Sequence, residues 1–293
     1  MLTANERYGV HFGDCVEHMA TMPDASMDMS VFSPPFPSLY AYTSSPADIG
    51  NSEDLKSEAR IHLSFFFRQF ARIMKPGRVV AVHVCQIPRM KRTGGVGMFD
   101  FRGLIIRIGE RAGLVYEYDW LITKNPQAQA IRTKSRELQF SGLESDRARQ
   151  RGSIGDYIIK FRAPGENAVK IDSDGQVSRN EWIDWAESSW TNIRETNTLN
   201  VREGRGEEDT KHICPLQLDV IDRLVRLYTN PGEIVFSPFT GIGSEGYVAV
   251  KRGRRFYGCE LKEEYYNAAM NNLRRADAEA EQTASDTLFR SAV

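Results

Sequence analysis

Apolar residues recur along this chain with two spacings, one typical of strands and one typical of helices. Short apolar runs bounded by glycine, proline or charged residues predict strands. They lie at residues 8–12, 27–32, 78–84, 115–122, 156–161, 233–237 and 255–260. Longer segments with apolar residues every three to four positions predict helices. These lie at residues 16–22, 55–73, 101–112, 215–228, 241–252 and 262–275.

Because strands and helices alternate, the pattern predicts an α/β fold with an open, largely parallel sheet covered on both faces. Two stretches interrupt the alternation. Residues 37–53 are rich in Ser, Tyr, Pro and Gly, and a loop of this length is often a functional lid. The stretch that runs to residue 210 after the strand at 156–161 is polar, and we expect Trp182, Trp185 and Trp190 to pack a small core there.

Composition is that of an ordinary globular protein, with 293 residues, 41% hydrophobic and 26% charged. No apolar run approaches the roughly 18 to 20 residues of a membrane span, and the start lacks the layout of a secretory signal, so we expect a soluble, cytoplasmic protein. The four cysteines form no C-x-x-C pair and the five histidines do not cluster, which predicts neither a metal site nor disulfides. Net charge is −1, so nucleic-acid binding would require a local basic face.

A glycine loop between a strand and a helix is the first candidate site. The stretch I-V-F-S-P-F-T-G-I-G-S covers residues 234–244, and its small residues allow a ligand to approach the backbone at a helix amino end. The next strand ends in Glu260, where nucleoside-binding sheets hold ribose hydroxyls. The plain alternatives are a tight turn and a solvated strand end. A third glycine is missing, which argues against a dinucleotide.

The second candidate is S-P-P-F at residues 33–36, directly after an apolar strand. The prolines end that strand because they cannot donate to a ladder, and they stiffen the corner. Taken alone, this tetrapeptide is better explained as a rigid turn between a strand and a loop.

Together these motifs resemble those of the DNA amino-methyltransferases. F-S-P-F-T-G-I-G-S resembles their D-P-F-x-G-S-G-T cofactor loop, and S-P-P-F their D/N/S-P-P-Y/F/W catalytic motif. F-G-D-C (12–15) and H-I-C-P-L-Q-L (212–218) resemble two further motifs. With the catalytic motif early and the cofactor loop late, the order resembles the permuted β class. Ser237 stands where the family has Asp, and Ile242 lies between the two loop glycines.

This resemblance implies a fold and a cofactor. The fold would be the Rossmann-like, circularly permuted fold of S-adenosylmethionine-dependent methyltransferases, with a mixed seven-stranded sheet. Its third strand would be residues 9–12, beside the strand that ends in Glu260, so that Asp14 would reach the adenine amino group. The implied cofactor-binding residues are Asp14, Ser237, Phe239, Gly241, Gly243, Ser244 and Glu260.

The implied reaction is methylation of the exocyclic amine of cytosine or adenine in double-stranded DNA. Ser33 and the carbonyl of Pro34 would accept the amine protons, Pro35 would brace the corner, and a flipped base would stack on Phe36. The amine would then attack the methyl group in line. Ser before the prolines favours cytosine N4. Cytosine C5 methylation is disfavoured, because no Cys lies at the active turn.

The resemblance also implies an organisation for the chain. Residues 1–124 would be the catalytic half, 125–210 an inserted target-recognition region, 211–278 the cofactor half and 279–293 a flexible tail. DNA phosphates would be contacted by Arg132, Lys134, Arg136, Arg149 and Arg151, which are equally typical of a solvated helix face. The resemblance also fits a bacterial or phage source and a role in restriction-modification. Whether the protein forms a homodimer stays open. The alternatives are the same chemistry on RNA or a protein glutamine, and an inactive DNA-binding protein.

Overall fold

The strands form one sheet in which segments far apart in sequence lie side by side. The computed structural model describes residues 1–36, 58–89, 97–133, 143–144, 147, 152–172, 175–200 and 215–291. Within them the strand order is β1-β10-β9-β2-β3-β7-β6-β8. The bounds are β1 Tyr8–Phe12, β2 Met29–Phe32, β3 Val79–Cys85, β6 Val115–Ile122, β7 Asp156–Arg162, β8 Ser189–Trp190, β9 Ile234–Ser237 and β10 Arg255–Glu260. A separate antiparallel pair is formed by β4 (Ile87–Pro88) and β5 (Met98–Phe99).

The sheet is mixed, because β7 runs antiparallel to β3 and β6 while all other neighbours are parallel. The amino-terminal strand β1 pairs with β10 from Tyr8↔Phe256 to Phe12↔Glu260. This pairing confirms the predicted position of residues 9–12. One strand exceeds the predicted seven: the two-residue β8 pairs with the end of β6, where the ring of Trp190 stacks on Trp120 at 5.1 Å.

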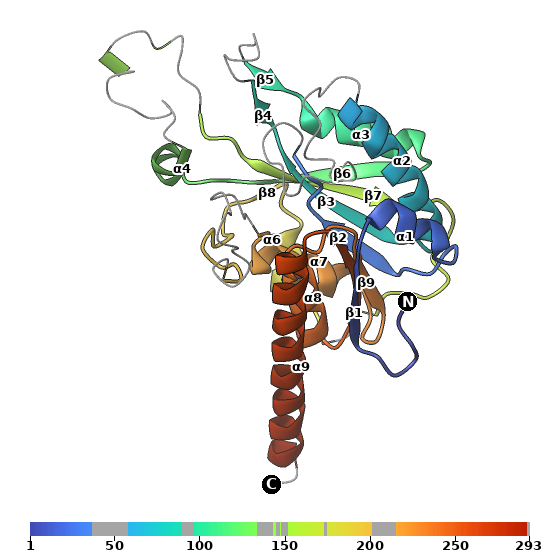
Figure 1. Ribbon diagram of the computed structural model, residues 1–293. Coiled ribbons are helices and arrows are strands. Elements are labelled where there is room, and N and C mark those ends of the chain that lie inside the picture. The colour runs from blue at the N-terminus through green and yellow to red at the C-terminus, as the bar shows by residue number, and fades with distance from the viewer. Residues whose placement is uncertain are drawn as a thin grey trace.

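Helices cover both faces of the sheet (Figure 1). One face carries α1 (Cys15–Thr21), α2 (Glu58–Ile73) and α3 (Phe101–Arg111), and the other carries α7 (Leu218–Tyr228), α8 (Ser244–Lys251) and α9 (Glu263–Ser291). The chain also forms two short helices, α4 (Pro126–Thr133) and α6 (Arg179–Trp185). Successive residues of β3 show how the sheet serves two cores, since Val80 and Val82 belong to the first core and Ala81 to the second.

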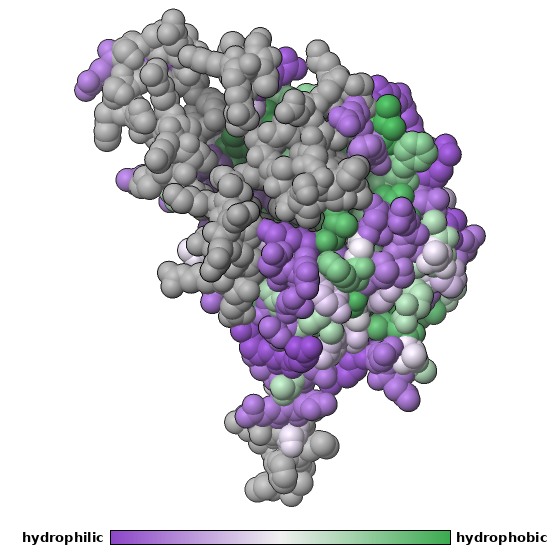
Figure 2. Space-filling view, viewed as in Figure 1, coloured by the Kyte–Doolittle hydropathy of each residue, from purple (hydrophilic) through white to green (hydrophobic). Residues whose placement is uncertain are grey.

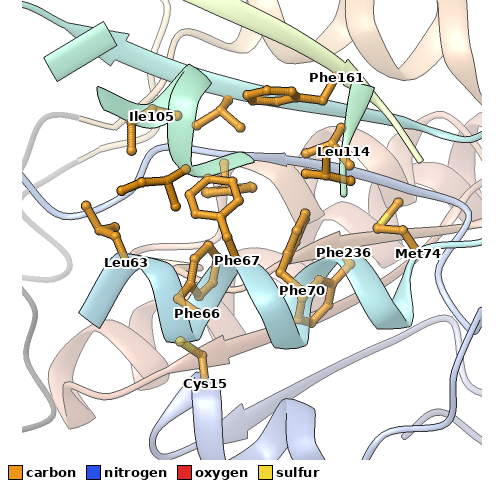
Figure 3. Packing of buried hydrophobic residues seen from close by; sticks show 14 of the residues in the cluster. Cys15, Leu63, Phe66, Phe67, Phe70, Met74, Ile105, Leu114, Phe161 and Phe236 are labelled. Atoms are coloured by element: carbon orange, nitrogen blue, oxygen red, sulfur yellow. The ribbon is translucent and has the colours of Figure 1, made fainter. Parts of the chain in front are cut away.

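Phenylalanines dominate the first core. Figure 3 shows Phe66, Phe67 and Phe70 along α2, packed against Phe161 of β7 and Phe236 of β9. These α2 residues recur at helical spacing and are fully buried. The interlocked rings fix α2 against the strands β2, β9 and β7, which position the candidate site.

Part of the range 125–210, predicted as an inserted region, contributes to the main sheet. Strand β7 lies inside that range and pairs with both β3 and β6 over its length. Trp185 and Trp190 are buried, and Trp190 belongs to the core under α7, whereas Trp182 is 61% exposed. The expectation of a small core formed by the three tryptophans is therefore wrong, because Trp182 is exposed and Trp190 packs in the core of the main sheet.

The carboxyl-terminal helix is longer than the predicted 262–275. Helix α9 has 29 residues and extends away from the sheet (Figure 1). The residues after 275 are rich in Ala and Glu, which favour helix, and neither Gly nor Pro follows Gly258 to end it. The predicted helix end was therefore too early.

Polar and apolar residues are interspersed on the described part of the face shown in Figure 2. Exposed large apolar side chains, such as Phe65 and Ile183, come from different elements. No helix in the described part of the chain is long and apolar enough to cross a membrane.

Candidate active site

The candidate residues lie where neighbouring parallel strands end. Strands β1, β10, β9, β2 and β3 all run in one direction, so their carboxyl ends form a single edge of the sheet. Asp14 follows β1, Glu260 ends β10, Ser237 ends β9 and Ser33 follows β2. The chain leaves β9 towards β10 and leaves β2 towards β3, in opposite directions. Such a switch point is where open α/β sheets bind their ligands.

The loop after β9 depends on glycines. Gly241 has a φ of +53° and Gly243, the N-cap of α8, a φ of +89°. A Cβ on Gly243 would lie 3.1 Å from the Cα of Ala269 in α9. Glycine is therefore required at 243 both by conformation and by space. Ile242, between them, is buried with Leu199 and Ala268, so its side chain belongs to the core.

Glu260 holds this loop to β10. Its two carboxylate oxygens accept hydrogen bonds from the backbone N–H groups of Gly241 (2.7 Å) and Lys262 (2.9 Å). A carboxylate oxygen is an acceptor, the chemistry that a ligand hydroxyl requires. Asp14 lies beside it, since Gly13 N donates to the Glu260 carbonyl at 2.9 Å. One oxygen of Asp14 caps α1 by accepting from Val16 N and Glu17 N.

The loop also buries polar groups that lack partners among the described residues. The hydroxyls of Ser237 and Ser244 are buried without a hydrogen bond. Buried polar atoms are usually satisfied, so these two indicate a place for the polar atoms of a ligand. Glu245, a residue that sequence reasoning missed, is also buried. Burial raises the pKa of Glu245 to about 8, and the charge of Glu260 adds to the shift.

Phe239 connects the loop to strand β2. Its ring packs 5.9 Å from Phe32 and 5.0 Å from Phe66, measured between centroids. Phe32 directly precedes Ser33. Strand β2 is further joined to β9 by the Ser30 hydroxyl, which donates to the Phe236 carbonyl at 2.7 Å. The glycine loop and the S-P-P-F corner are thus fixed relative to each other.

The S-P-P-F corner lies at the end of β2. Pro34 is buried, and Phe36 is half-buried with its ring 5.5 Å from Phe101. The hydroxyl of Ser33 lies 3.0 Å from Nδ1 of His83 and 3.3 Å from the His83 carbonyl oxygen. Strand β3 places His83 there, because it pairs with β2 in parallel register.

Two more residues that sequence reasoning missed stand behind His83. Its Nε2 atom lies 2.9 Å from Oδ2 of Asp156, and Lys124 Nζ lies 2.7 Å from the same oxygen. Burial alone would raise the pKa of Asp156, but His83 and Lys124 outweigh it and lower that pKa to about 2. The carboxylate is therefore ionised at neutral pH. The available signal was a lone polar residue inside an apolar strand, at His83.

Comparison with known proteins identifies the family. The model of the N6/N4 DNA methylases matches residues 27–271, and the chain belongs to this family. The type II methyltransferase M1.MboII of Moraxella bovis is 43% identical over 58 residues, 20% of this chain and 22% of that protein. M.BglII of Bacillus subtilis is 42% identical over 74 residues, 25% of this chain and 20% of its own length. The matches thus span about a fifth of each relative.

Solved structures share the fold over nearly the whole chain. The protein TTHA0409 of Thermus thermophilus, in complex with S-adenosyl-L-methionine, has a TM-score of 0.67 and 20% identity, and the match covers 92% of this chain and 94% of that one. The cytosine-N4-specific PvuII DNA methyltransferase has a TM-score of 0.66 and 17% identity, covering 94% and 92%. The predicted methyltransferase fold is confirmed.

Some predicted residues fall outside the structural description. Lys134, Arg136, Arg149 and Arg151 lie outside the described residues, as does the side chain of Arg132, whose backbone is in α4. The predicted lid over 37–53 lies outside them too. Among the described residues, no group of three or more His, Cys, Asp or Glu is placed to hold a metal ion.

Proposed function

We propose that this protein is an S-adenosylmethionine-dependent DNA methyltransferase that methylates the exocyclic amine of a flipped base. The observation that carries the proposal is the adjacency of β9 and β2 at the switch point. A glycine loop suited to a cofactor follows β9, and S-P-P-F follows β2. Family membership and the shared fold support the same activity.

The loop residues fit this cofactor. Glu260 would accept from the ribose hydroxyls, and the free oxygen of Asp14 would accept from the adenine amine. Gly241, Gly243, Ser244 and Ser237 would line the cofactor, and Phe239 supports the loop from the core side. When bound, the cofactor supplies a methyl group on a sulfonium.

The corner residues would activate the base. An exocyclic amine is a weak nucleophile because its lone pair is delocalised into the ring. The Ser33 hydroxyl and the Pro34 carbonyl would accept its two protons and so return the lone pair to nitrogen. Pro34 and Pro35 hold these acceptors in place before the substrate arrives. Stacking of the base on Phe36 would contribute roughly 1–3 kcal/mol.

The substrate is double-stranded DNA in this proposal, and Ser33 favours cytosine N4 over adenine N6. The basic residues Arg132 to Arg151 would neutralise phosphates, so that affinity falls as salt rises. The cell compartment is proposed as the cytoplasm, beside the DNA.

The test is incubation of the protein with labelled S-adenosylmethionine and, separately, duplex DNA, RNA and protein extract. Nucleoside mass spectrometry of the DNA then identifies the product. N4-methylcytosine is expected, and N6-methyladenine would correct only the target base. Label in RNA or protein alone would reassign the substrate. Cofactor binding by calorimetry without any transfer would favour an inactive DNA-binding protein.

A further inference from the structure

Three side chains extend from the Ser33 hydroxyl into the protein. His83, Asp156 and Lys124 follow one another at 3.0, 2.9 and 2.7 Å, from β3, the first residue of β7, and the residues after β6. Their side chains are only 12%, 14% and 9% exposed. Burying charged groups is costly unless they are paired, so this arrangement requires an explanation.

A purely structural ion pair would need Lys124 and Asp156 alone. His83 adds a ring that has Asp156 on one side and Ser33 on the other. Its Nε2 atom is buried and makes no well-aligned hydrogen bond within the described residues, and it lies 2.9 Å from Oδ2 of Asp156. An ionised carboxylate at that distance favours the tautomer with the proton on Nε2. Nδ1 then presents its lone pair to the Ser33 hydroxyl.

The proposed reaction creates a proton that must leave. When the amine nitrogen bonds to the methyl carbon, the sulfur–carbon bond breaks, sulfur becomes a neutral thioether and the nitrogen becomes cationic. The nitrogen regains neutrality by losing one proton. Ser33, which accepts a hydrogen bond from the amine, can take that proton only if it gives up its own.

We propose that His83 is the positioning residue that orients the Ser33 hydroxyl and receives its proton as the amine proton moves onto Ser33. This inference rests on the proposed function. The oxygen of Ser33 ends neutral, the ring becomes an imidazolium, and the carboxylate of Asp156 stabilises it. Lys124 is the other charged group at this site. Its ammonium opposes a lasting charge on the ring, so the proton passes on to water.

The first test needs neither cofactor nor DNA. Nitrogen-15 NMR of the labelled protein at about pH 8, where an ordinary imidazole is neutral, distinguishes a protonated ring nitrogen from an unprotonated one. We expect His83 with its proton on Nε2, and a shifted Nδ1 signal in Ser33→Ala. A proton on Nδ1 would overturn the inference.

The second test is the pH profile of single-turnover methyl transfer to unmethylated genomic duplex DNA. The wild-type rate should rise with pH, because only the neutral ring can take the proton. His83→Asn keeps a hydrogen-bond acceptor but cannot take a proton. At the upper end of the pH range this variant should transfer the methyl group about 100-fold more slowly than the wild type. Its rate should not rise with pH, and its affinity for the cofactor should be unchanged. His18→Asn is the matched control, because His18 is a half-buried histidine that bonds Tyr257 instead.

Asp156→Asn covers the case in which His83→Asn does not fold. Loss of the carboxylate removes the group that stabilises the imidazolium, so the dependence of the rate on pH should differ from that of the wild type. An unmoved profile would contradict the proposal. Equal rates and profiles for wild type and His83→Asn would overturn the role of His83 and leave the proposed function standing. If the wild-type protein transferred no methyl group under any condition, that result would contradict both the proposed function and this inference.

Discussion

The glycine loop and the S-P-P-F corner follow adjacent strands, yet they are built in different ways. The loop is shaped by its own backbone, with left-handed glycines and the N–H group of Gly241, which donates to Glu260. The corner is completed by side chains from β3, β7 and the residues after β6. A site built from contiguous backbone is visible in a sequence, whereas one assembled from three strands is not. Substitutions should separate the two: the corner governs the rate, and the loop governs cofactor affinity.

The largest effect is expected at the corner. Ser33→Ala removes the proposed acceptor of an amine proton, and we expect methyl transfer about 100-fold slower or worse. Cofactor affinity should stay unchanged in calorimetry, because Ser33 is not in the loop. Ser64→Ala is the control, since Ser64 is exposed and its hydroxyl donates to the Arg60 carbonyl of its own helix. An unchanged rate for Ser33→Ala would contradict the proposed role.

In the loop, Glu260→Ala should weaken cofactor binding about 10- to 100-fold, because hydrogen bonds to a charged group contribute roughly 1.5–3 kcal/mol each. The rate at saturating cofactor should change much less. Glu263→Ala, at an exposed position three residues on, removes the same charge from the start of α9. Equal dissociation constants for the two variants would refute the assignment of Glu260.

Two glycine substitutions test whether cofactor binding depends on the backbone conformation of the loop. Gly243→Ala forces a left-handed Ala, which costs roughly 1–2 kcal/mol, and pushes a Cβ towards α9. We expect a lower melting temperature and weaker cofactor binding. Gly253→Ala is matched, with a φ of +71° and nothing within 4 Å of the added Cβ. It should lower the melting temperature alone. If both variants bound cofactor like wild type, the loop would not need its glycine.

The smallest effect is expected at Glu245, whose pKa lies at about 8 in the folded protein. A raised carboxyl pKa contributes stability at low pH that is lost as the pH rises from the unfolded value towards 8. Glu245→Gln should therefore be less sensitive to pH across this window and more stable than wild type above it. Denaturant unfolding at several pH values checks this, and parallel pH dependences would contradict a buried neutral Glu245.

Much of the fold was predictable because the residues within each element carry its helix or strand pattern. Phe66, Phe67 and Phe70 recur at helical spacing, and the strand bounds at 115–122 and 255–260 agree with β6 and β10. Errors arose where burial came from a distant partner. Trp190 was assigned to a separate core because its partner Trp120 lies 70 residues earlier. The helix at 262–275 was ended too early, although its continuing Ala and Glu residues favoured extension.

The sequence alone determined the order of strands and helices, the two motifs and the family. These depend on side-chain periodicity and on glycines and prolines, whose conformational preferences act within a few residues. Only the tertiary structure decided that β7 lies between β3 and β6, and that Asp156 thereby reaches His83 beside Ser33. Pairing of strands is set by burial and register across the whole sheet, so it brings together residues whose spacing along the chain carries no signal.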